Sequence, residues 1–217
     1  MRLNKRTKSF LLSGMIGVMA AASAFPALAA TGWTKVGDKQ YYYFDNGQMA
    51  TGLQNLNDTY YYFQSDGTMW TGWLKLDNDY YYMQNDGSLS TGWVNISNEW
   101  YYMRPDSGKC VLNEAMEIEG SWYFLKSDGK RLGGWLKKDG EFRYMDPADN
   151  GRMIINASKV IDGVTYSFGP NGVCSTAVQV TNYYDAGTVA ASETTNNSSA
   201  ETDNSGKSNV IVAGQNN

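Results

Sequence analysis

Short aromatic runs alternate with polar turns along the chain, and this pattern recurs about every 20 residues from Thr31 to Cys174. Each period holds a run that begins at Gly-Trp, a polar turn, a four-residue run such as YYYF at 41–44, and then Asp or Asn followed by Gly. Aromatic residues favour strands, whereas Asn-Gly and Asp-Gly pairs favour turns with positive φ. Each period is therefore predicted to form a β-hairpin followed by a linking turn.

A column of glycines sets the length of the repeat. Its members are 20 to 22 residues apart: Gly47, Gly67, Gly87, Gly108, Gly129, Gly151 and Gly172. About seven units thus occupy residues 31–174. A single two-stranded hairpin is only marginally stable, so each unit has to stack its apolar face on a neighbour. We predict an all-β fold, a superhelical solenoid of β-hairpins.

The position of each residue in the four-residue run predicts the face on which it lies. The fourth position is apolar in every unit: Phe44, Phe63, Met83, Met103, Leu125, Met145 and Phe168. Because side chains alternate along a strand, the second position shares the face of the fourth, and both are interpreted as residues that stack one hairpin on the next. The first and third positions face the other way and are interpreted, with the first-strand Trp, as ligand contacts.

The two ends of the chain have a different composition from the repeats. Residues 1–30 combine a basic start, an apolar stretch of small residues at 10–25 and the small-residue sequence ALA at 27–29, which predicts a secretory signal peptide rather than a transmembrane anchor. Residues 175–217 are rich in Thr, Ser, Asn, Ala and Gly, which predicts a disordered tail. The expected organisation is therefore a signal peptide at 1–30, the solenoid at 31–174 and the tail at 175–217.

Composition narrows the classes of function. The chain has no His, which excludes Ser-His-Asp, Cys-His and HExxH sites, and its 2 Cys cannot form a four-thiolate zinc site. No metal and no cofactor are expected. Outside residues 1–30, 14 basic and 22 acidic residues give a net charge of −8, which argues against nucleic acid as a partner. No second apolar span follows the signal, so no membrane is expected as a partner once the signal is removed.

The aromatic residues suggest the chemistry of a ligand. A first-strand Trp recurs as Trp33, Trp73, Trp93 and Trp135 and is replaced in the other units by Leu53, Ala115 and Ser158. Two rings that face each other across a hairpin, with one ring of the next unit, would form a three-walled box. Such a box suits a quaternary ammonium group, held by about 0.5–2 kcal/mol per ring, or the apolar face of a sugar. Single sites of this kind are weak, and a repeated array attaches firmly only to a polymer.

The pattern of TGW, YYY or WYY, DG and Met resembles the choline-binding repeats of Gram-positive surface proteins, which are cell-wall-binding repeats similar to the glucan-binding and clostridial toxin repeats. The resemblance covers residues 31–174, closely in the first four units and loosely in the last three. It implies a hairpin superhelix in which successive units hold the choline of teichoic acids between two rings of one unit and one ring of the next.

The resemblance also implies which residues bind the ligand. The candidate boxes pair Trp93 with Trp100, Trp73 with Tyr80, and Trp33 with Tyr41. The third wall is Trp122, Tyr123 or Phe124 for the first box, Tyr101 or Tyr102 for the second, and Tyr61 or Tyr62 for the third; the candidate set takes Trp122, Tyr102 and Tyr62. The residue at the head of strand two is Tyr in the first three units, where the family usually has Trp, so a glucan ligand remains open beside choline.

These features together predict a secreted, non-enzymatic protein of the cell surface that binds a cell-wall polymer, either choline-substituted teichoic acid or a glucan. About 40 residues lie outside the signal and the repeats, which is too few for a catalytic fold. Two alternatives remain open: an accessory or targeting subunit of a wall-active hydrolase, and a surface adhesin or spacer. Whether the protein forms a homodimer is also left open.

Overall fold

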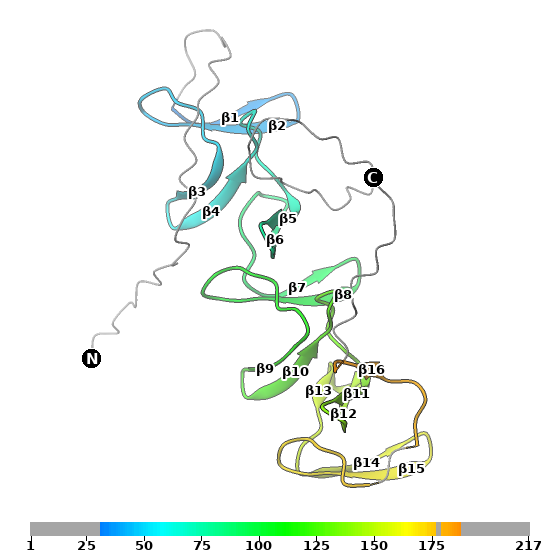
Figure 1. Ribbon diagram of the computed structural model, residues 1–217. Coiled ribbons are helices and arrows are strands. Elements are labelled where there is room, and N and C mark those ends of the chain that lie inside the picture. The colour runs from blue at the N-terminus through cyan, green and yellow to red at the C-terminus, as the bar shows by residue number, and fades with distance from the viewer. Residues whose placement is uncertain (1–30, 177–178, 188–217) are drawn as a thin grey trace, which may run out of the picture. The chain divides into compact units, whose positions relative to one another are not determined.

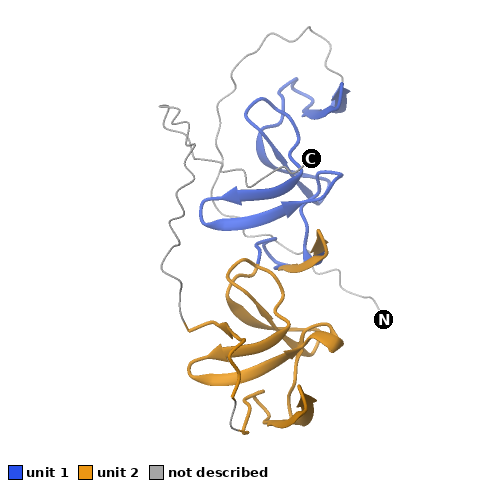
Figure 2. Cartoon of the chain, turned by 90° about the vertical axis from the view of Figure 1, so that its right-hand side faces the viewer, with its two compact units in different colours: residues 1–94, 103–110, 207–217 blue, residues 95–102, 111–206 orange. Residues whose placement is uncertain are grey.

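The computed structural model describes residues 31–176 and 179–187 (Figure 1). These residues form two compact units, and the boundary between the units falls within one β-hairpin (Figure 2). Residues 31–94 and 103–110 belong to the first unit, and residues 95–102, 111–176 and 179–187 to the second. The predicted signal peptide at 1–30 and residues 188–217 of the predicted tail lie outside the described part of the chain.

The first unit is a series of antiparallel hairpins. Its strands are β1 (Gly32–Val36), β2 (Lys39–Tyr43), β3 (Gly52–Leu56), β4 (Thr59–Phe63), β5 (Gly72–Leu76) and β6 (Asp79–Met83). They pair as β1–β2, β3–β4 and β5–β6. The next pair, β7 (Gly92–Ile96) and β8 (Glu99–Met103), is the hairpin in which the boundary between the units falls.

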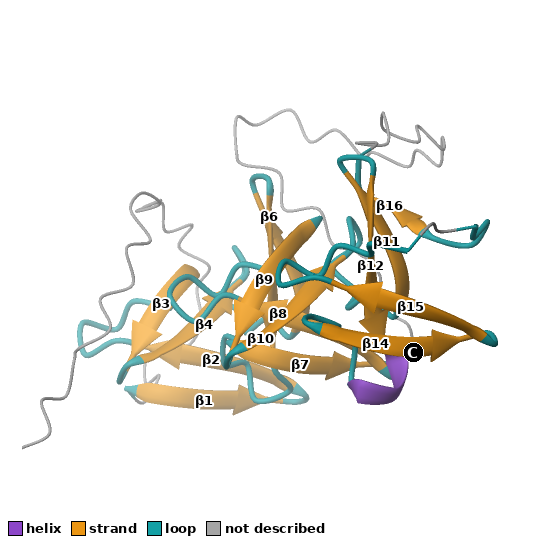
Figure 3. Cartoon of the chain, turned by 90° about the horizontal axis from the view of Figure 1, so that it is seen from below, coloured by secondary structure: helices purple, strands orange, loops and turns teal. Residues whose placement is uncertain are grey.

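The second unit continues the same pattern and adds one larger sheet. Its strands are β9 (Glu114–Ile118), β10 (Ser121–Leu125), β11 (Gly134–Lys138), β12 (Glu141–Asp146), β13 (Arg152–Met153), β14 (Ala157–Ile161), β15 (Val164–Phe168) and β16 (Tyr184–Asp185). β9 pairs with β10 and β14 with β15, while the order β13-β12-β11-β16 forms a four-stranded sheet. Figure 3 shows the strands as orange arrows and, in purple, the 3-10 helix Pro147–Asp149 that follows β12.

The turns behave as the sequence predicts. Gly47 and Gly67 have φ of 78° and 80°, a region that L side chains rarely adopt. The side chain of Asp66 accepts hydrogen bonds from the backbone N–H (2.9 Å) and the hydroxyl (2.6 Å) of Thr68, and these bonds hold the pKa of that carboxyl below its ordinary value. The Asp and Asn side chains that precede the glycines are therefore turn-forming groups.

Successive hairpins are joined by one recurring backbone hydrogen bond. For five of the seven glycines in the column, the residue two positions later donates its N–H to the carbonyl near the start of strand two in the preceding repeat. The bonds run from Met69 to Gln40 (2.8 Å), from Leu89 to Tyr60 (2.9 Å), from Cys110 to Tyr80 (2.7 Å), from Arg131 to Trp100 (2.7 Å) and from Cys174 to Phe142 (2.8 Å). Cys110 and Cys174 both occupy this repeat position, where the backbone N–H rather than the side chain makes the bond between hairpins.

The interior lies between adjacent hairpins rather than in one central core. At the fourth strand-two position, the interior prediction is confirmed: Phe63, Met83, Met103, Leu125 and Met145 are fully buried, and Phe168 is 4% exposed. The first repeat departs from the prediction by one residue. Tyr43, not Phe44, is the counterpart of Phe63, because Gly32 pairs with Tyr43 and Gly52 pairs with Phe63.

Residues 179–187 form part of the second unit, although composition places them in a tail without structure. β16 runs parallel to β11, with Leu136 opposite Tyr184 and Lys137 opposite Asp185, and the N–H of Ala186 donates to the carbonyl of Lys137 at 2.8 Å. The polar composition of the whole tail masks two tyrosines, which supply enough apolar surface to order this segment locally. We call residues 179–187 the C-terminal arm.

The glycine column should tolerate alanine unequally. A Cβ at Gly67 would collide with the side chain of Met49 in the preceding repeat. A Cβ at Gly47 would meet nothing within 4 Å, and both residues have positive φ. Gly67→Ala should therefore lower the free energy of unfolding by about 2–3 kcal/mol and Gly47→Ala by about 1–2 kcal/mol, because only the first also displaces a packed side chain. Chemical denaturation measures both values, and equal losses would contradict the close approach of Met49.

Candidate functional site

Trp33 and three other aromatic rings form an open cage in the first unit, which we call the Trp33 cage. The Trp33 ring lies 5.4 Å from that of Tyr42, which is directly opposite on β2, and 4.9 Å from that of Tyr61 on β4, with interplanar angles of 78° and 70°. Phe63 adds a fourth ring at 5.8 Å. Trp33 keeps 44% of its surface exposed, so the cage is accessible from solvent. Two hairpins are needed to build it.

Two residues of the predicted Trp33 box do not line it as expected. Trp33 pairs with Tyr42, and Tyr41 pairs with Thr34, so Tyr41 lies on the opposite face of the hairpin. On the next hairpin the ring in contact with Trp33 is that of Tyr61 rather than Tyr62. The prediction that Tyr41 faces Trp33 is therefore wrong, because the hairpin register places the opposing ring nine residues after the Trp.

The second strand-two position, which the sequence analysis treats as a stacking position and, at Tyr61, as one of two alternatives for the third wall, supplies this closing ring. Hairpins stack with the Trp face of one unit against the second- and fourth-position face of the next. A stacking residue and a cage wall are therefore the same residue at this column. The signal that identifies Tyr61 is the 20-residue period. It has to be counted from Gly32 and Gly52 rather than from the start of each aromatic run.

A second cage with the same ring positions lies around Trp135 in the second unit. Its ring is 5.0 Å from Tyr144 on the same hairpin, 4.8 Å from Tyr166 on the next hairpin and 6.0 Å from Phe168. The interplanar angles are 69°, 75° and 34°, close to those of the Trp33 cage. The fourth ring of each cage, Phe63 or Phe168, is the buried fourth-position residue.

The two cages differ in exposure. Trp135 is only 6% exposed, against 44% for Trp33. Val180 and Tyr183 of the C-terminal arm pack against the cluster that contains Trp135, and Phe142 adds a fifth ring at 6.3 Å. Within the described residues, the Nε1 of Trp135 is buried with no hydrogen-bond partner. The Trp135 cage is thus closed by side chains of the protein itself.

The predicted Trp73 box is described only in part. Trp73 lies opposite Tyr82, with ring centroids 5.4 Å apart at 73°, which is the arrangement of Trp33 with Tyr42. Tyr80 instead pairs with Lys75, whose ammonium lies 5.3 Å from the centre of the Tyr80 ring. The ring at the head of strand two therefore holds a cation of the protein itself.

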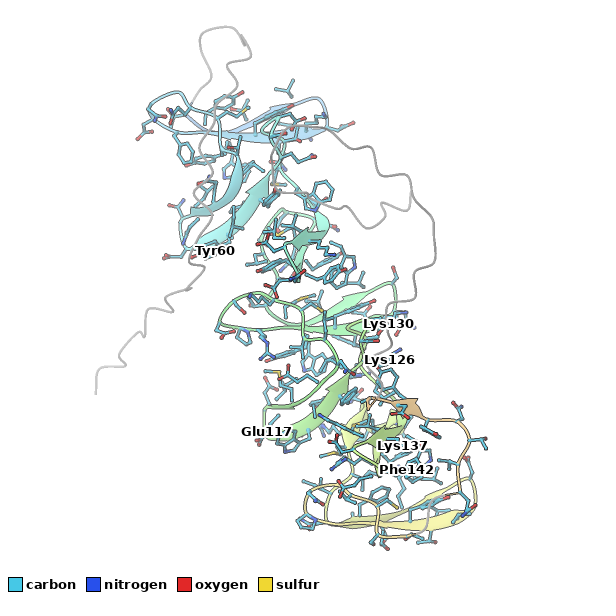
Figure 4. All side chains as sticks on the ribbon, in the orientation of Figure 1. Tyr60, Glu117, Lys126, Lys130, Lys137 and Phe142 are labelled. Atoms are coloured by element: carbon cyan, nitrogen blue, oxygen red, sulfur yellow. The ribbon has the colours of Figure 1, made fainter. Side chains whose placement is uncertain are left out.

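Cations also lie beside the rings at the head of β8 and of β12, from the following repeat at Trp100 and from the paired strand at Phe142. The guanidinium of Arg131 lies 5.7 Å from the Trp100 ring, and the ammonium of Lys137 lies 5.9 Å from the Phe142 ring (Figure 4). Burial lowers the pKa of Arg131 from its ordinary value. Trp100 nevertheless keeps 39% of its surface exposed, and Trp122 keeps 38%.

The residues of the predicted Trp93 box are divided between the two compact units. Trp93 belongs to the first unit, and Trp100 and Trp122 belong to the second. Tyr102, which was assigned to the Trp73 box, also belongs to the second unit, where it is 8% exposed and burial raises its pKa. The Trp93 box and the closure of the Trp73 box by Tyr102 remain predictions.

At two of the three positions where the first-strand Trp is missing, Leu53 and Ala115, another aromatic ring of the chain fills the space. In the first unit Trp70 is 9% exposed, packs with Tyr81, Met83 and Tyr62, and donates its Nε1–H to the carbonyl of Trp73 at 3.0 Å. This is the slot next to Leu53, which pairs with Tyr62.

In the second unit the slot next to Ala115 is filled by Tyr184 of the C-terminal arm. Ala115 pairs with Phe124, and the Tyr184 ring lies 5.7 Å from the Phe124 ring. The Tyr184 hydroxyl accepts from the N–H of Ser127 (2.8 Å) and donates to Oδ1 of Asn113 (3.3 Å). Sequence reasoning missed both filling residues, because Trp70 stands in a column that holds no aromatic residue in the other repeats and Tyr184 lies outside the repeats.

Two other kinds of feature were sought in the described residues. No group of three or more His, Cys, Asp and Glu side chains there could hold a metal ion. Within residues 31–176 and 179–187, no helix is long and apolar enough to cross a membrane.

Known structures with the same fold are choline-binding proteins. Choline-binding protein F of Streptococcus pneumoniae, solved with a peptidoglycan analogue, is 33% identical with a TM-score of 0.60, over 68% of this chain and 47% of that one. CbpJ of Streptococcus pneumoniae TIGR4 is 32% identical with a TM-score of 0.59, over 67% of this chain and 48% of that one. CbpF in complex with ipratropium is 30% identical with a TM-score of 0.59, over 74% and 54%. The chain therefore spans about half the length of these structures.

Family comparisons agree with the structural ones. No curated protein matches the chain. The family described as choline-binding repeat matches residues 50–89, 71–114 and 112–158, and the cell wall binding repeat matches residues 31–49. The matched segments cover more than half of the chain and include both hairpins of the Trp33 cage and the β11–β12 hairpin that carries Trp135. The chain belongs to the choline-binding repeat family.

Proposed function

We propose that this protein is an exported, non-catalytic protein of the cell surface that attaches to the cell wall by holding quaternary ammonium groups of a wall polymer in its aromatic cages. The observation on which the proposal depends is the Trp33 cage, in which four rings converge and Trp33 remains 44% exposed. The faces of aromatic rings attract a cation that has no N–H to donate, and each ring contributes about 0.5–2 kcal/mol.

The protein's own cations favour a cationic ligand over a sugar. The rings of Tyr80, Trp100 and Phe142 each hold a Lys or Arg side chain within 6 Å of the ring centre. Aromatic surfaces of this solenoid thus already hold cationic side chains of the protein. A sugar would need polar side chains beside the ring to satisfy its hydroxyls, and the four rings of the Trp33 cage carry two tyrosine hydroxyls and one indole N–H.

The polymer supplies the affinity that a single cage lacks. One cage is expected to bind free choline with a Kd on the order of millimolar, which corresponds to about 4 kcal/mol. A polymer that carries many choline groups engages several cages at once, and attachment then exceeds the single-site affinity by orders of magnitude. Teichoic acid that bears choline has the required chemistry.

Binding to a choline-substituted resin tests the proposal. The protein should be retained by the resin and eluted by free choline at millimolar concentration, and it should bind purified cell walls until their choline is removed. An unsubstituted resin and a glucan resin are the controls. Retention by the glucan resin alone would replace the cation with a sugar, and failure to bind any of the three would contradict the proposed function.

A further inference from the structure

We propose that the C-terminal arm is a releasable plug and that the Trp135 cage beneath it is a second, latent site for a quaternary ammonium ligand. The class of ligand rests on the proposed function, whereas the plug itself rests on the packing of the arm. The chain would then have an open cage at Trp33 and a closed one at Trp135, with different apparent affinities for the same ligand.

The two cages match ring for ring. Trp135 with Tyr144, Tyr166 and Phe168 reproduces Trp33 with Tyr42, Tyr61 and Phe63, and the corresponding centroid distances agree within about half an ångström. A cage that served only as packing would not need to keep this geometry. The Nε1 of Trp135 is also buried without a partner among the described residues, which is costly in a finished interior.

The arm reaches two adjacent slots because side chains alternate along it. Tyr184 faces the slot next to Ala115, where its ring contacts Phe124. Tyr183 faces the other way, and its ring lies 5.4 Å from that of Phe142 at 87°, beside the Trp135 cage. One tyrosine therefore anchors the arm in a slot that lacks its Trp, and the other covers a slot that has one.

The arm also gives a cation of the protein a place beside the cage. The ammonium of Lys137 lies 5.4 Å from the centre of the Tyr183 ring and 5.9 Å from that of the Phe142 ring. Figure 4 places Lys137 and Phe142 together on β11 and β12. In the closed state the ammonium of Lys137 therefore already interacts with the faces of these two rings. A ligand cation has to compete with this interaction.

The anchorage of the arm is small enough to be released. Its two-residue strand β16 pairs with β11, and the hydroxyl of Tyr184 makes two hydrogen bonds, to Ser127 and Asn113. Only two residues separate the arm from Thr176, so the arm docks on its own chain. If the arm is closed about nine tenths of the time, the apparent affinity of the Trp135 cage falls about tenfold, and only a dense array of ligand groups opens it.

Two variants of the full chain test the plug. Tyr183→Ala removes the ring that covers the cage, and Tyr184→Phe keeps the anchoring ring but loses both hydroxyl bonds. Each should raise by one the number of tetramethylammonium ions bound per chain, measured by equilibrium dialysis at a concentration that saturates only the open cages of the parent. Tyr184→Phe should tighten the latent site roughly 2- to 10-fold, because it loses two hydrogen bonds and full release of the arm recovers no more than the tenfold penalty. Tyr41→Ala, in the first unit, is the matched control.

A second measurement reports the plug without any ligand. Exchange of the Trp135 indole N–H with solvent, followed by NMR, should be faster in both arm variants than in the parent and the Tyr41→Ala control. Unchanged exchange would overturn the plug, and faster exchange without an additional bound ion would overturn the latent site. If the parent binds no ion but Tyr183→Ala binds one, the proposed open site fails and the latent site stands. Absence of binding in all variants overturns both.

Discussion

Replacing Trp33 with alanine is expected to weaken the binding of choline to the first cage by about 2- to 30-fold while lowering the free energy of unfolding by only about 1 kcal/mol. The Trp33 ring contacts the other three rings of the cage and contributes its own cation–π attraction of about 0.5–2 kcal/mol. Because Trp33 is 44% exposed, its removal loses less buried surface than the removal of a fully buried Trp. Isothermal titration with choline and denaturation by urea measure the two quantities separately.

Two adjacent tyrosines provide the matched control for this site. Tyr42→Ala should also weaken choline binding, by about 2- to 30-fold, because Tyr42 is a wall of the cage, whereas Tyr41→Ala should leave binding unchanged. The two changes remove the same side chain from the same strand. Equal effects of the two substitutions, or retention of full affinity by Trp33→Ala, would place the ligand elsewhere.

The repeat and its hairpins could be predicted from the sequence because their causes are local. The glycine column and the aromatic strand runs are read directly from the letters. The partner of Trp33 could not be chosen in this way, because three consecutive tyrosines, Tyr41 to Tyr43, satisfy the same pattern in any register. The register is set by the turn between β1 and β2, and shifting it by one residue moves every side chain to the other face.

The occupancy of each slot could not be predicted, because the filling residues are distant or irregular in sequence. The sequence identifies Leu53 and Ala115 as positions that lack the cage Trp, yet it does not indicate that Trp70 and Tyr184 fill the resulting spaces. The C-terminal arm is an extreme case, since Tyr184 bonds to Asn113, 71 residues earlier. Its composition resembles that of a tail, and only tertiary contacts order it.

A single principle relates the open, filled and plugged slots. Each hairpin has to cover the aromatic face of its neighbour, and a slot left empty would cost the chain dispersion contacts on both sides. The protein fills such a slot with its own ring at Leu53 and Ala115, where the cage Trp is absent. Where the Trp is present, the slot stays open at Trp33 and is covered by the arm at Trp135. Binding capacity is therefore set by which slots lack a filling side chain.

This principle predicts losses of stability of different size when two tryptophans of the first unit are replaced. Trp70→Ala should lower the free energy of unfolding by about 3–5 kcal/mol, because Trp70 is 9% exposed, packs against Tyr81 and Met83, and bonds to the carbonyl of Trp73. Trp33→Ala makes the same chemical change at an exposed position and should cost about 1 kcal/mol. Urea denaturation followed by circular dichroism measures the difference.

Trp70→Phe separates ring filling from hydrogen bonding in the same slot. It keeps an aromatic ring between the hairpins and loses the donor to the Trp73 carbonyl, so the expected loss is about 1–2 kcal/mol. Choline binding at the Trp33 cage should persist in this variant, because no wall of that cage is changed. If Trp70→Ala were no more destabilising than Trp33→Ala, Trp70 would not be the residue that fills the slot beside Leu53, and the distinction between filled and open slots would fail.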